Sequence, residues 1–273
     1  MLASFLFTLR EGLEAALIIG IVLGTLDKIH RSEMKPTVWL GAGSAIIVSL
    51  LTALVLNWIG ASFEGTTEEV FEGITMLLAA GVLTWMIFWM YRQAKNQRVE
   101  LAADVRRAAM TGGKQALFSL AFLAVVREGI ELALFLTATA FVAESGQLFL
   151  GIGLGFATVI VLSWALFKGL VQLNLGRFFM VTSILLILFA AGLVAHSVHE
   201  FNEAGWIPSV IEHVWDINHI LDENSIAGQI LKALFGYNGN PSLTEVLAYL
   251  SYFAIIGLSL WRVRRNEPLL QKA

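Results

Sequence analysis

Long apolar runs alternate with shorter polar segments along the whole chain. A helix that crosses a bilayer needs roughly 20 mostly apolar residues. Seven runs approach this length, near 2–26, 37–60, 71–91, 116–142, 147–169, 178–200 and 244–261. The pattern predicts an all-α, polytopic membrane protein with seven spans in a single transmembrane domain, 1–273.

Composition supports a membrane protein, with 57% hydrophobic residues, 14% charged residues and a mean hydropathy of +0.74. The chain has no cysteine, which excludes disulfides and thiolate metal sites and leaves oxygen and imidazole as the strong metal ligands. The first residues lack the basic start and small-residue cleavage site of a signal peptide. We therefore expect the first span to be retained. The charge distribution does not suggest nucleic-acid binding.

The positive charges indicate the orientation, because lysine and arginine in short loops mark the cytoplasmic side. Most of the 18 lysines and arginines fall after the first span, in the 92–114 loop, in the Lys168 to Arg177 turn and in the tail from Arg262. The segments between these places are acidic, including the one that holds Glu144. This predicts an N-terminus outside and a C-terminus inside the membrane, with an acidic outer mouth.

A short motif occurs twice, as REGLEAALII at 10–19 and REGIELALFL at 127–136, and LLAAGVL at 77–83 pairs with LFAAGLV at 188–194. Spans one to three therefore resemble spans four to six. Because each half has three spans, the halves run through the membrane in opposite directions, as in many secondary transporters. The predicted boundaries are repeat one at 1–92, a cytoplasmic loop at 93–115, repeat two at 116–200, an outer loop at 201–243 and an additional seventh span at 244–262.

The duplicated motif places charged side chains in the apolar interior, where each costs roughly 2.5–3.5 kcal/mol on insertion scales. In the first copy, Glu11 and Glu14 share a helix face, and Arg10 lies four residues before Glu14. The second copy repeats this spacing with Arg127, Glu128 and Glu131. Helix rises of 1.5 Å put both copies near mid-membrane. Salt bridges that clamp helices would explain the arginines but leave spare acid on both helices.

Clustered carboxylates without thiolates suit hard cations such as magnesium, calcium, manganese or ferric iron. Gly12 and Gly129 would let another helix approach beside the carboxylates. Because protonated carboxylates do not bind a cation, we expect acid pH to weaken uptake. Residue types and spacing indicate a hard-cation site without identifying the ion.

The paired REGLE and REGIE motifs in a chain of this length resemble the RExxE signature of the high-affinity iron permeases. HEFNEAGWIP at 199–208 and GYNGNPS at 236–242 are also typical of bacterial members. The resemblance implies import of iron, ferric after external oxidation, with Glu11, Glu14, Glu128 and Glu131 as metal ligands. It implies Arg10 and Arg127 as their charge partners. It further implies a transporter rather than an enzyme, iron as substrate with no cofactor, and periplasmic or extracellular iron-oxidising or delivery proteins as partners.

Two acidic groups near the outer side are weaker candidates. At the end of the sixth span, imidazole and carboxylate side chains at helical spacing form a possible receiving site for iron: His196, His199, Glu200 and Glu203. At the start of the third span, acids favour the helix dipole without any ligand, so capping explains them better: Glu68, Glu69 and Glu72. We also expect one or two short amphipathic helices in the long outer loop and an inner-surface helix in the basic 92–114 loop.

Three alternatives stay open beside the iron permease. The same scaffold could import another hard or divalent cation. An intramembrane carboxylate metalloenzyme is less favoured, because di-iron bundles use Glu-x-x-His pairs whereas both motifs here are Glu-x-x-Glu. A proton relay or signalling component is the third. The sequence leaves open the oligomeric state, the coupling ion and whether both motifs bind one ion jointly.

Overall fold

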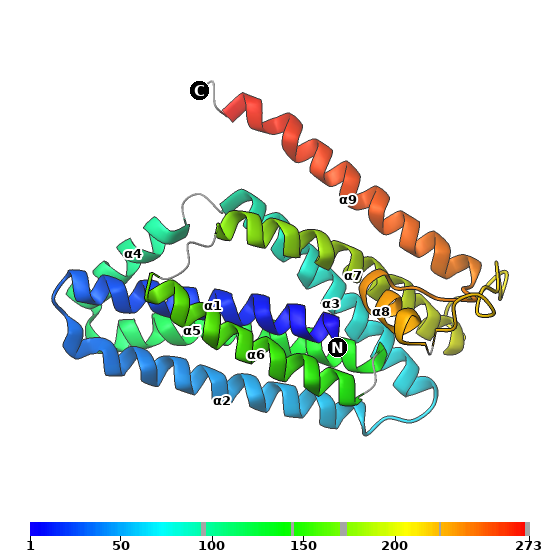
Figure 1. The fold of residues 1–273 in the computed structure, drawn as a ribbon, viewed down its shortest axis with the longest axis horizontal. Coiled ribbons are helices and arrows are strands. Elements are labelled where there is room, and N and C mark those ends of the chain that lie inside the picture. The colour runs from blue at the N-terminus through cyan, green and yellow to red at the C-terminus, as the bar shows by residue number, and fades with distance from the viewer. Residues whose placement is uncertain (94–96, 143–144, 170–173, 224, 271–273) are drawn as a thin grey trace. The chain divides into compact units, whose positions relative to one another are not determined.

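The computed structural model describes residues 1–93, 97–142, 145–169, 174–223 and 225–270, and every regular element in these stretches is helical (Figure 1). Glu144 lies outside the described residues. The elements in chain order are α1 (Leu2–Lys28), the 3-10 turn η1 (Ser32–Met34), α2 (Lys35–Gly60), α3 (Thr66–Gln93), α4 (Gln97–Arg107), the π-helical turn η2 (Ala108–Gly112), α5 (Gly113–Val142), α6 (Ser145–Phe167), α7 (Leu175–Glu203), α8 (Ile226–Phe235) and α9 (Leu243–Leu270).

The predicted all-α class is confirmed. Each of the seven apolar runs corresponds to one long helix, although α6 ends at Phe167, two residues before the predicted end of its run. Among the described residues, five of these helices are long and apolar enough to cross a membrane: α2, α3, α6, α7 and α9. The other two, α1 and α5, have 27 and 30 residues and carry the REGLE and REGIE motifs. The chain is therefore a multi-pass membrane protein.

The contacts divide the chain into two compact units. The first unit comprises Met1–Ser62 and Val82–Leu186, and the second comprises Phe63–Gly81 and Ile187–Ala273. Helices α3 and α7 each contribute residues to both units.

In the first unit, the most extensive helix packing joins α2 to α5 and α1 to α6, and α1 also packs against α5. The motif glycines explain how closely these helices approach. A Cβ on Gly12 would lie 2.8 Å from Val159 Cγ2 of α6, and one on Gly129 would overlap Ser49 Oγ of α2. Each motif helix thus packs on a helix from the other half of the sequence.

The turn between α1 and α2 is fixed by polar contacts to Asp27. Lys35 Nζ lies 2.6 Å from Asp27 Oδ1, and Ser32 Oγ donates to the same oxygen at 2.7 Å. Lys35, and then Ser32, lower the pKa of Asp27 below its ordinary value by hydrogen bonding to its carboxylate.

Beyond α3, the basic loop contains α4, which confirms the helix expected there.

The second unit contains the long segment between α7 and α9. Its one regular element in the described residues is α8, which begins where Ser225 Oγ accepts a hydrogen bond from Gly228 N at 3.0 Å. The helix ends at Gly236, whose left-handed φ of +65° suits glycine. A Cβ on Gly192 of α7 would lie 2.6 Å from Gly236 Cα, so the two backbones touch. The expectation of a short helix in this loop is confirmed.

Candidate metal centre

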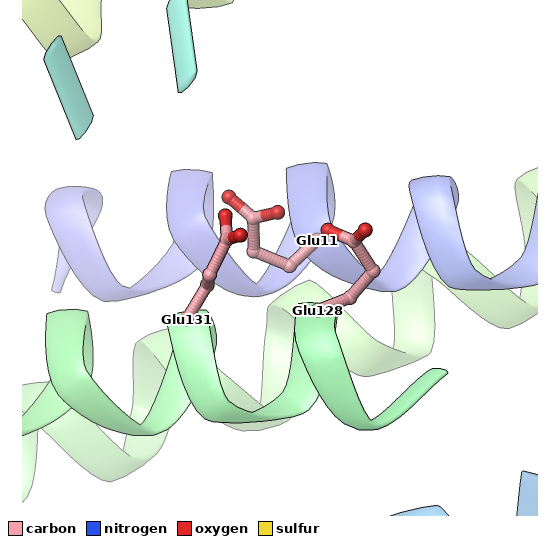
Figure 2. Close-up of side chains that lie close together, drawn as sticks. All are labelled: Glu11, Glu128 and Glu131. Carbon is pink, nitrogen blue, oxygen red and sulfur yellow. The ribbon is translucent and has the colours of Figure 1, made fainter. Parts of the chain in front are cut away.

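Three motif carboxylates meet between α1 and α5 (Figure 2). Glu11 projects from α1, while Glu128 and Glu131 project from α5, and one oxygen from each lies within 4.8 Å of the other two. The three residues are only 1%, 5% and 7% exposed. Because Glu128 and Glu131 are three residues apart, both reach the same face of α5. We call this group the carboxylate cluster.

Each motif arginine pairs with glutamates of its own helix. The guanidinium of Arg10, 0% exposed, places Nη1 3.0 Å from Glu11 Oε1 and Nη2 3.4 Å from Glu14 Oε1. Arg127 places Nε 2.9 Å from Glu131 Oε1. The predicted charge partners therefore occupy one oxygen of Glu11 and one of Glu131.

The opposite oxygens of the carboxylate cluster lack such partners. Among the described residues, Oε2 of Glu11, Glu128 and Glu131 is buried without a hydrogen bond. A buried acceptor without a partner costs free energy, and more when it is charged. A cation bound among the three carboxylates would satisfy these oxygens directly.

Glu14, the fourth predicted ligand, lies outside the carboxylate cluster. Its Oε1 lies 3.4 Å from Nη2 of Arg10 but, like the Oε2 atoms of the carboxylate cluster, is buried without a hydrogen bond. The carboxylate of Glu14 is close enough to interact electrostatically with Glu128 and Glu131. The structure thus brings together three of the four predicted ligands and leaves Glu14 as a neighbouring negative charge.

An aromatic pair adjoins the carboxylate cluster along both motif helices. Phe7 lies one turn before Glu11 and Phe135 one turn after Glu131, and their ring centroids are 4.9 Å apart. Both rings are completely buried. Such an apolar neighbour keeps water away and strengthens electrostatic interactions of the carboxylates with each other and with a cation.

The donor set favours a hard cation. All three residues of the carboxylate cluster offer oxygen ligands, and oxygen ligands suit hard ions rather than soft ones. Within the part of the chain that the structure describes, this is the one group of three or more His, Asp or Glu residues whose ligand atoms could hold a metal ion. The arrangement can bind and release a cation, with the two arginines offsetting part of the negative charge.

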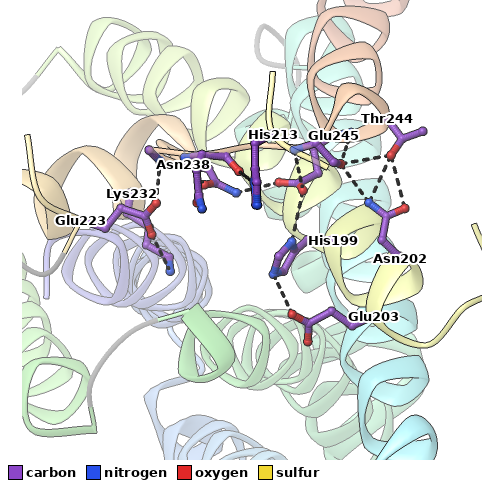
Figure 3. Close-up of polar contacts among 12 residues, drawn as sticks. His199, Asn202, Glu203, His213, Glu223, Lys232, Asn238, Thr244 and Glu245 are labelled. Atoms are coloured by element: carbon purple, nitrogen blue, oxygen red, sulfur yellow. Dashed lines mark hydrogen bonds and ion pairs between the residues drawn. The ribbon is translucent and has the colours of Figure 1, made fainter. Parts of the chain in front are cut away.

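The weaker candidates belong to the second unit, where His199 is held by two carboxylates (Figure 3). Its Nδ1 lies 3.1 Å from Glu245 Oε1 and its Nε2 lies 3.3 Å from Glu203 Oε1. Glu245 also accepts from Ser242 N at 3.1 Å, while Glu245 N donates to Ser242 Oγ at 3.3 Å. These reciprocal bonds form a capping box at the start of α9. The pattern Ser-x-x-Glu was present in the sequence, but our sequence reasoning missed Glu245.

Further bonds connect the end of α7 to the start of α9. Asn202 Nδ2 donates to Ser242 Oγ at 2.9 Å and to Thr244 Oγ1 at 3.1 Å, and Asn238 Nδ2 donates to Glu245 Oε2 at 2.8 Å (Figure 3). Both ring nitrogens of His199 are therefore engaged in a network that joins two helices.

The remaining outer candidates gather without forming a group that could hold a metal. Glu68 and Glu69 occupy the first turn of α3, where acids favour the helix dipole. The carboxylate of Glu72 interacts with the charges of Glu200, Glu68 and Glu203, so acids of α3 and α7 face each other within the second unit. His196 is half-buried near the end of α7. None of these residues belongs to the metal-compatible group found among the described residues.

The similarity of this chain to known proteins extends over nearly its whole length. The sequence model of the iron permease FTR1 family matches residues 1–262. The chain is 37% identical over 265 residues to the ferrous iron permease EfeU of Shigella sonnei (strain Ss046), covering 95% of this chain and 96% of that protein. It is 35% identical over 255 residues to the ferrous iron permease EfeU of Yersinia pestis, covering 92% and 90%. No solved structure matches the chain.

Proposed function

Since this chain belongs to the iron permease FTR1 family, we propose that it imports iron through the carboxylate cluster of Glu11, Glu128 and Glu131. Members of this family are iron permeases, that is, membrane transporters and not enzymes. The carboxylates therefore need only bind and release the ion. The observation that carries the proposal is the set of buried oxygens without hydrogen bonds, contributed by both motif helices.

We assign α1 and α5 to the membrane as well, which gives seven spans, with the N-terminus outside and the C-terminus inside the cytoplasmic membrane. The first three spans and the next three form an inverted repeat, with α9 as the additional span. The reciprocal packing of α1 on α6 and of α5 on α2 supports this arrangement. Gly12 meets Val159, the fifteenth residue of α6, and Gly129 meets Ser49, the fifteenth residue of α2. The two contacts therefore lie at equivalent positions of the two halves.

The ion in the carboxylate cluster is ferric in this proposal, and an external oxidising or delivery protein supplies it. All-oxygen ligation favours the harder ion. The relatives are named ferrous iron permeases, so import of ferrous iron is the alternative to the ferric assignment. Import of another hard cation, such as manganese, is the second candidate, because the same three carboxylates would accept it.

Proteoliposomes test the proposal with radioactive iron offered in two forms, as ferric citrate and as ferrous iron under anaerobic reduction. Neutralising any member of the carboxylate cluster, as in Glu11→Gln, Glu128→Gln or Glu131→Gln, should abolish uptake. Glu14→Gln should retain part of it, because Glu14 lies outside the group. The exposed Glu33, paired with Arg31 at 3.4 Å, provides a matched control in Glu33→Gln.

The two iron forms and a manganese competitor separate the alternatives. Uptake from ferric citrate that exceeds ferrous uptake supports the ferric assignment, and the reverse order contradicts it. Manganese uptake at the rate of iron would favour the second candidate. Undiminished uptake in all three glutamine variants of the carboxylate cluster would refute the proposed site.

A further inference from the structure

One turn of α3, from Trp85 to Trp89, reaches the arginine of the second motif. The guanidinium carbon of Arg127 lies 4.6 Å from the ring centroid of Trp89 and 5.4 Å from that of Trp85. The two indoles are stacked, with centroids 6.4 Å apart and planes inclined by 27°. Contacts of this length between a guanidinium and an indole face are attractive.

The same turn also reaches the arginine of the first motif. Met86, which lies between the two tryptophans in sequence and is buried, places Sδ 3.0 Å from Nη1 of Arg10. Each motif arginine therefore lies between glutamates of its own helix and a side chain of α3. Nothing in the sequence motif itself specifies this second contact.

From these contacts we infer that Trp85, Met86 and Trp89 are positioning residues for iron binding. They hold Arg10 and Arg127 against one oxygen of Glu11 and one of Glu131, and so leave the opposite oxygens available to the ion. The inference rests on the proposed function of the carboxylate cluster. The site then involves α3 in addition to α1 and α5, the two helices that carry the duplicated motif.

The physical need for such positioning is greatest at Arg127, whose side chain is 35% exposed and bonds a single motif carboxylate. A guanidinium has five donors. Without the indole faces, Arg127 could also pair with the second oxygen of Glu131 or with Glu128, and it would then compete with the cation. The tryptophans should therefore raise iron affinity without contacting iron.

Equilibrium dialysis of the purified protein against ferric citrate measures this effect. Replacing both indoles, Trp85→Leu with Trp89→Leu, should weaken iron binding about 2- to 30-fold, the range that cation–π contacts span. The variant Trp85→Phe with Trp89→Phe keeps aromatic faces and should recover most of the affinity. Trp164→Leu on α6 is the matched control, because Trp164 and Trp85 are similarly exposed, 58% and 56%. Thermal melting of each variant reports whether it is folded.

A double-mutant cycle with Arg127→Gln shows whether the tryptophans act through the arginine. In the Arg127→Gln background the leucine substitutions should change affinity by less than twofold, since the contact is already absent. Equal losses in both backgrounds, or no loss in the folded leucine variant, would overturn the inference.

Glu131→Gln, measured in parallel, separates this inference from the function on which it rests. Loss of binding in Glu131→Gln with normal binding in the leucine variant refutes only the positioning role. Normal binding in Glu131→Gln refutes the carboxylate cluster itself.

Discussion

The guanidinium of Arg10 is completely buried and bonds two glutamates, so its removal leaves carboxylates without a counter-charge. Arg10→Met makes this change with a side chain of similar length that can pack beside Met86. Breaking a buried ion pair by removing one partner costs about 3–5 kcal/mol, because the remaining charge stays desolvated. In a chain of this length each kcal/mol corresponds to roughly 2–4 °C in melting temperature. We therefore expect melting about 6–20 °C lower at neutral pH.

A second substitution distinguishes loss of charge balance from simple loss of packing. Glu11→Gln added to Arg10→Met removes the more deeply buried of the two unbalanced charges. The double variant should regain at least half of the lost stability, although it lacks one of the proposed iron ligands and should not transport. At acid pH the Arg10→Met deficit should shrink, since Glu11 and Glu14 can then take up protons.

The assay is thermal melting of purified protein in detergent, followed by iron uptake in proteoliposomes. Arg31→Met is the control, because Arg31 and Glu33 form an exposed pair at 3.4 Å that contributes about 0–1 kcal/mol. A double variant no more stable than Arg10→Met would refute the charge-balance reasoning. An Arg10→Met protein that melts like the wild type would refute the buried ion pair.

Three further predictions concern other contacts. His199→Gln removes the ion pair with Glu245 and should lower the free energy of unfolding by about 1.5–3 kcal/mol. The iron concentration for half-maximal uptake should stay unchanged. A shift in that concentration would place His199 on the path of iron. Gly129→Ala should lower the free energy of unfolding by about 1–3 kcal/mol by overpacking against Ser49, and adding Ser49→Gly should restore the melting temperature. A Gly129→Ala protein that melts like the wild type would show that α5 and α2 are further apart at this point. Hydrogen bonding lowers the folded-state pKa of Asp27, so its contribution to stability is present above its unfolded-state pKa of about 3.9 and is lost as pH falls through the lower folded-state value. The melting temperatures of Asp27→Asn and wild type should therefore differ at neutral pH and converge at lower pH. A difference that stays constant with pH would contradict this.

The helices could be predicted from the sequence because a spanning helix needs only a local feature, an apolar run of sufficient length. The meeting of α1 and α5 was predictable from the duplicated motif, since two sets of buried charges are less costly together than apart. The contacts of α3 with the arginines could not be predicted in this way. Trp85 and Met86 lie in an apolar run that looks the same whether it faces lipid, protein or a guanidinium.

The network around His199 shows a different limit. The cap at the start of α9 has a local signal, Ser242 followed three residues later by Glu245, and could have been found. The bond from Glu245 to His199 joins residues that are 46 positions apart. No periodicity connects them, so the sequence offered the histidine only as a weaker candidate ligand, whereas the structure pairs it with carboxylates.

The two copies of the motif are nearly identical in sequence but are used differently. Arg10 pairs with both Glu11 and Glu14, of which only Glu11 belongs to the carboxylate cluster, whereas Arg127 pairs with Glu131, which does belong to it. Helix spacing assigns Glu14 and Glu131 equivalent places, because each follows its arginine by four residues. Their neighbours make them unequal, since the carboxylate cluster includes one and excludes the other. The repeat therefore brings the two motif helices together, but an equivalent place in the motif does not by itself decide which carboxylates join the carboxylate cluster.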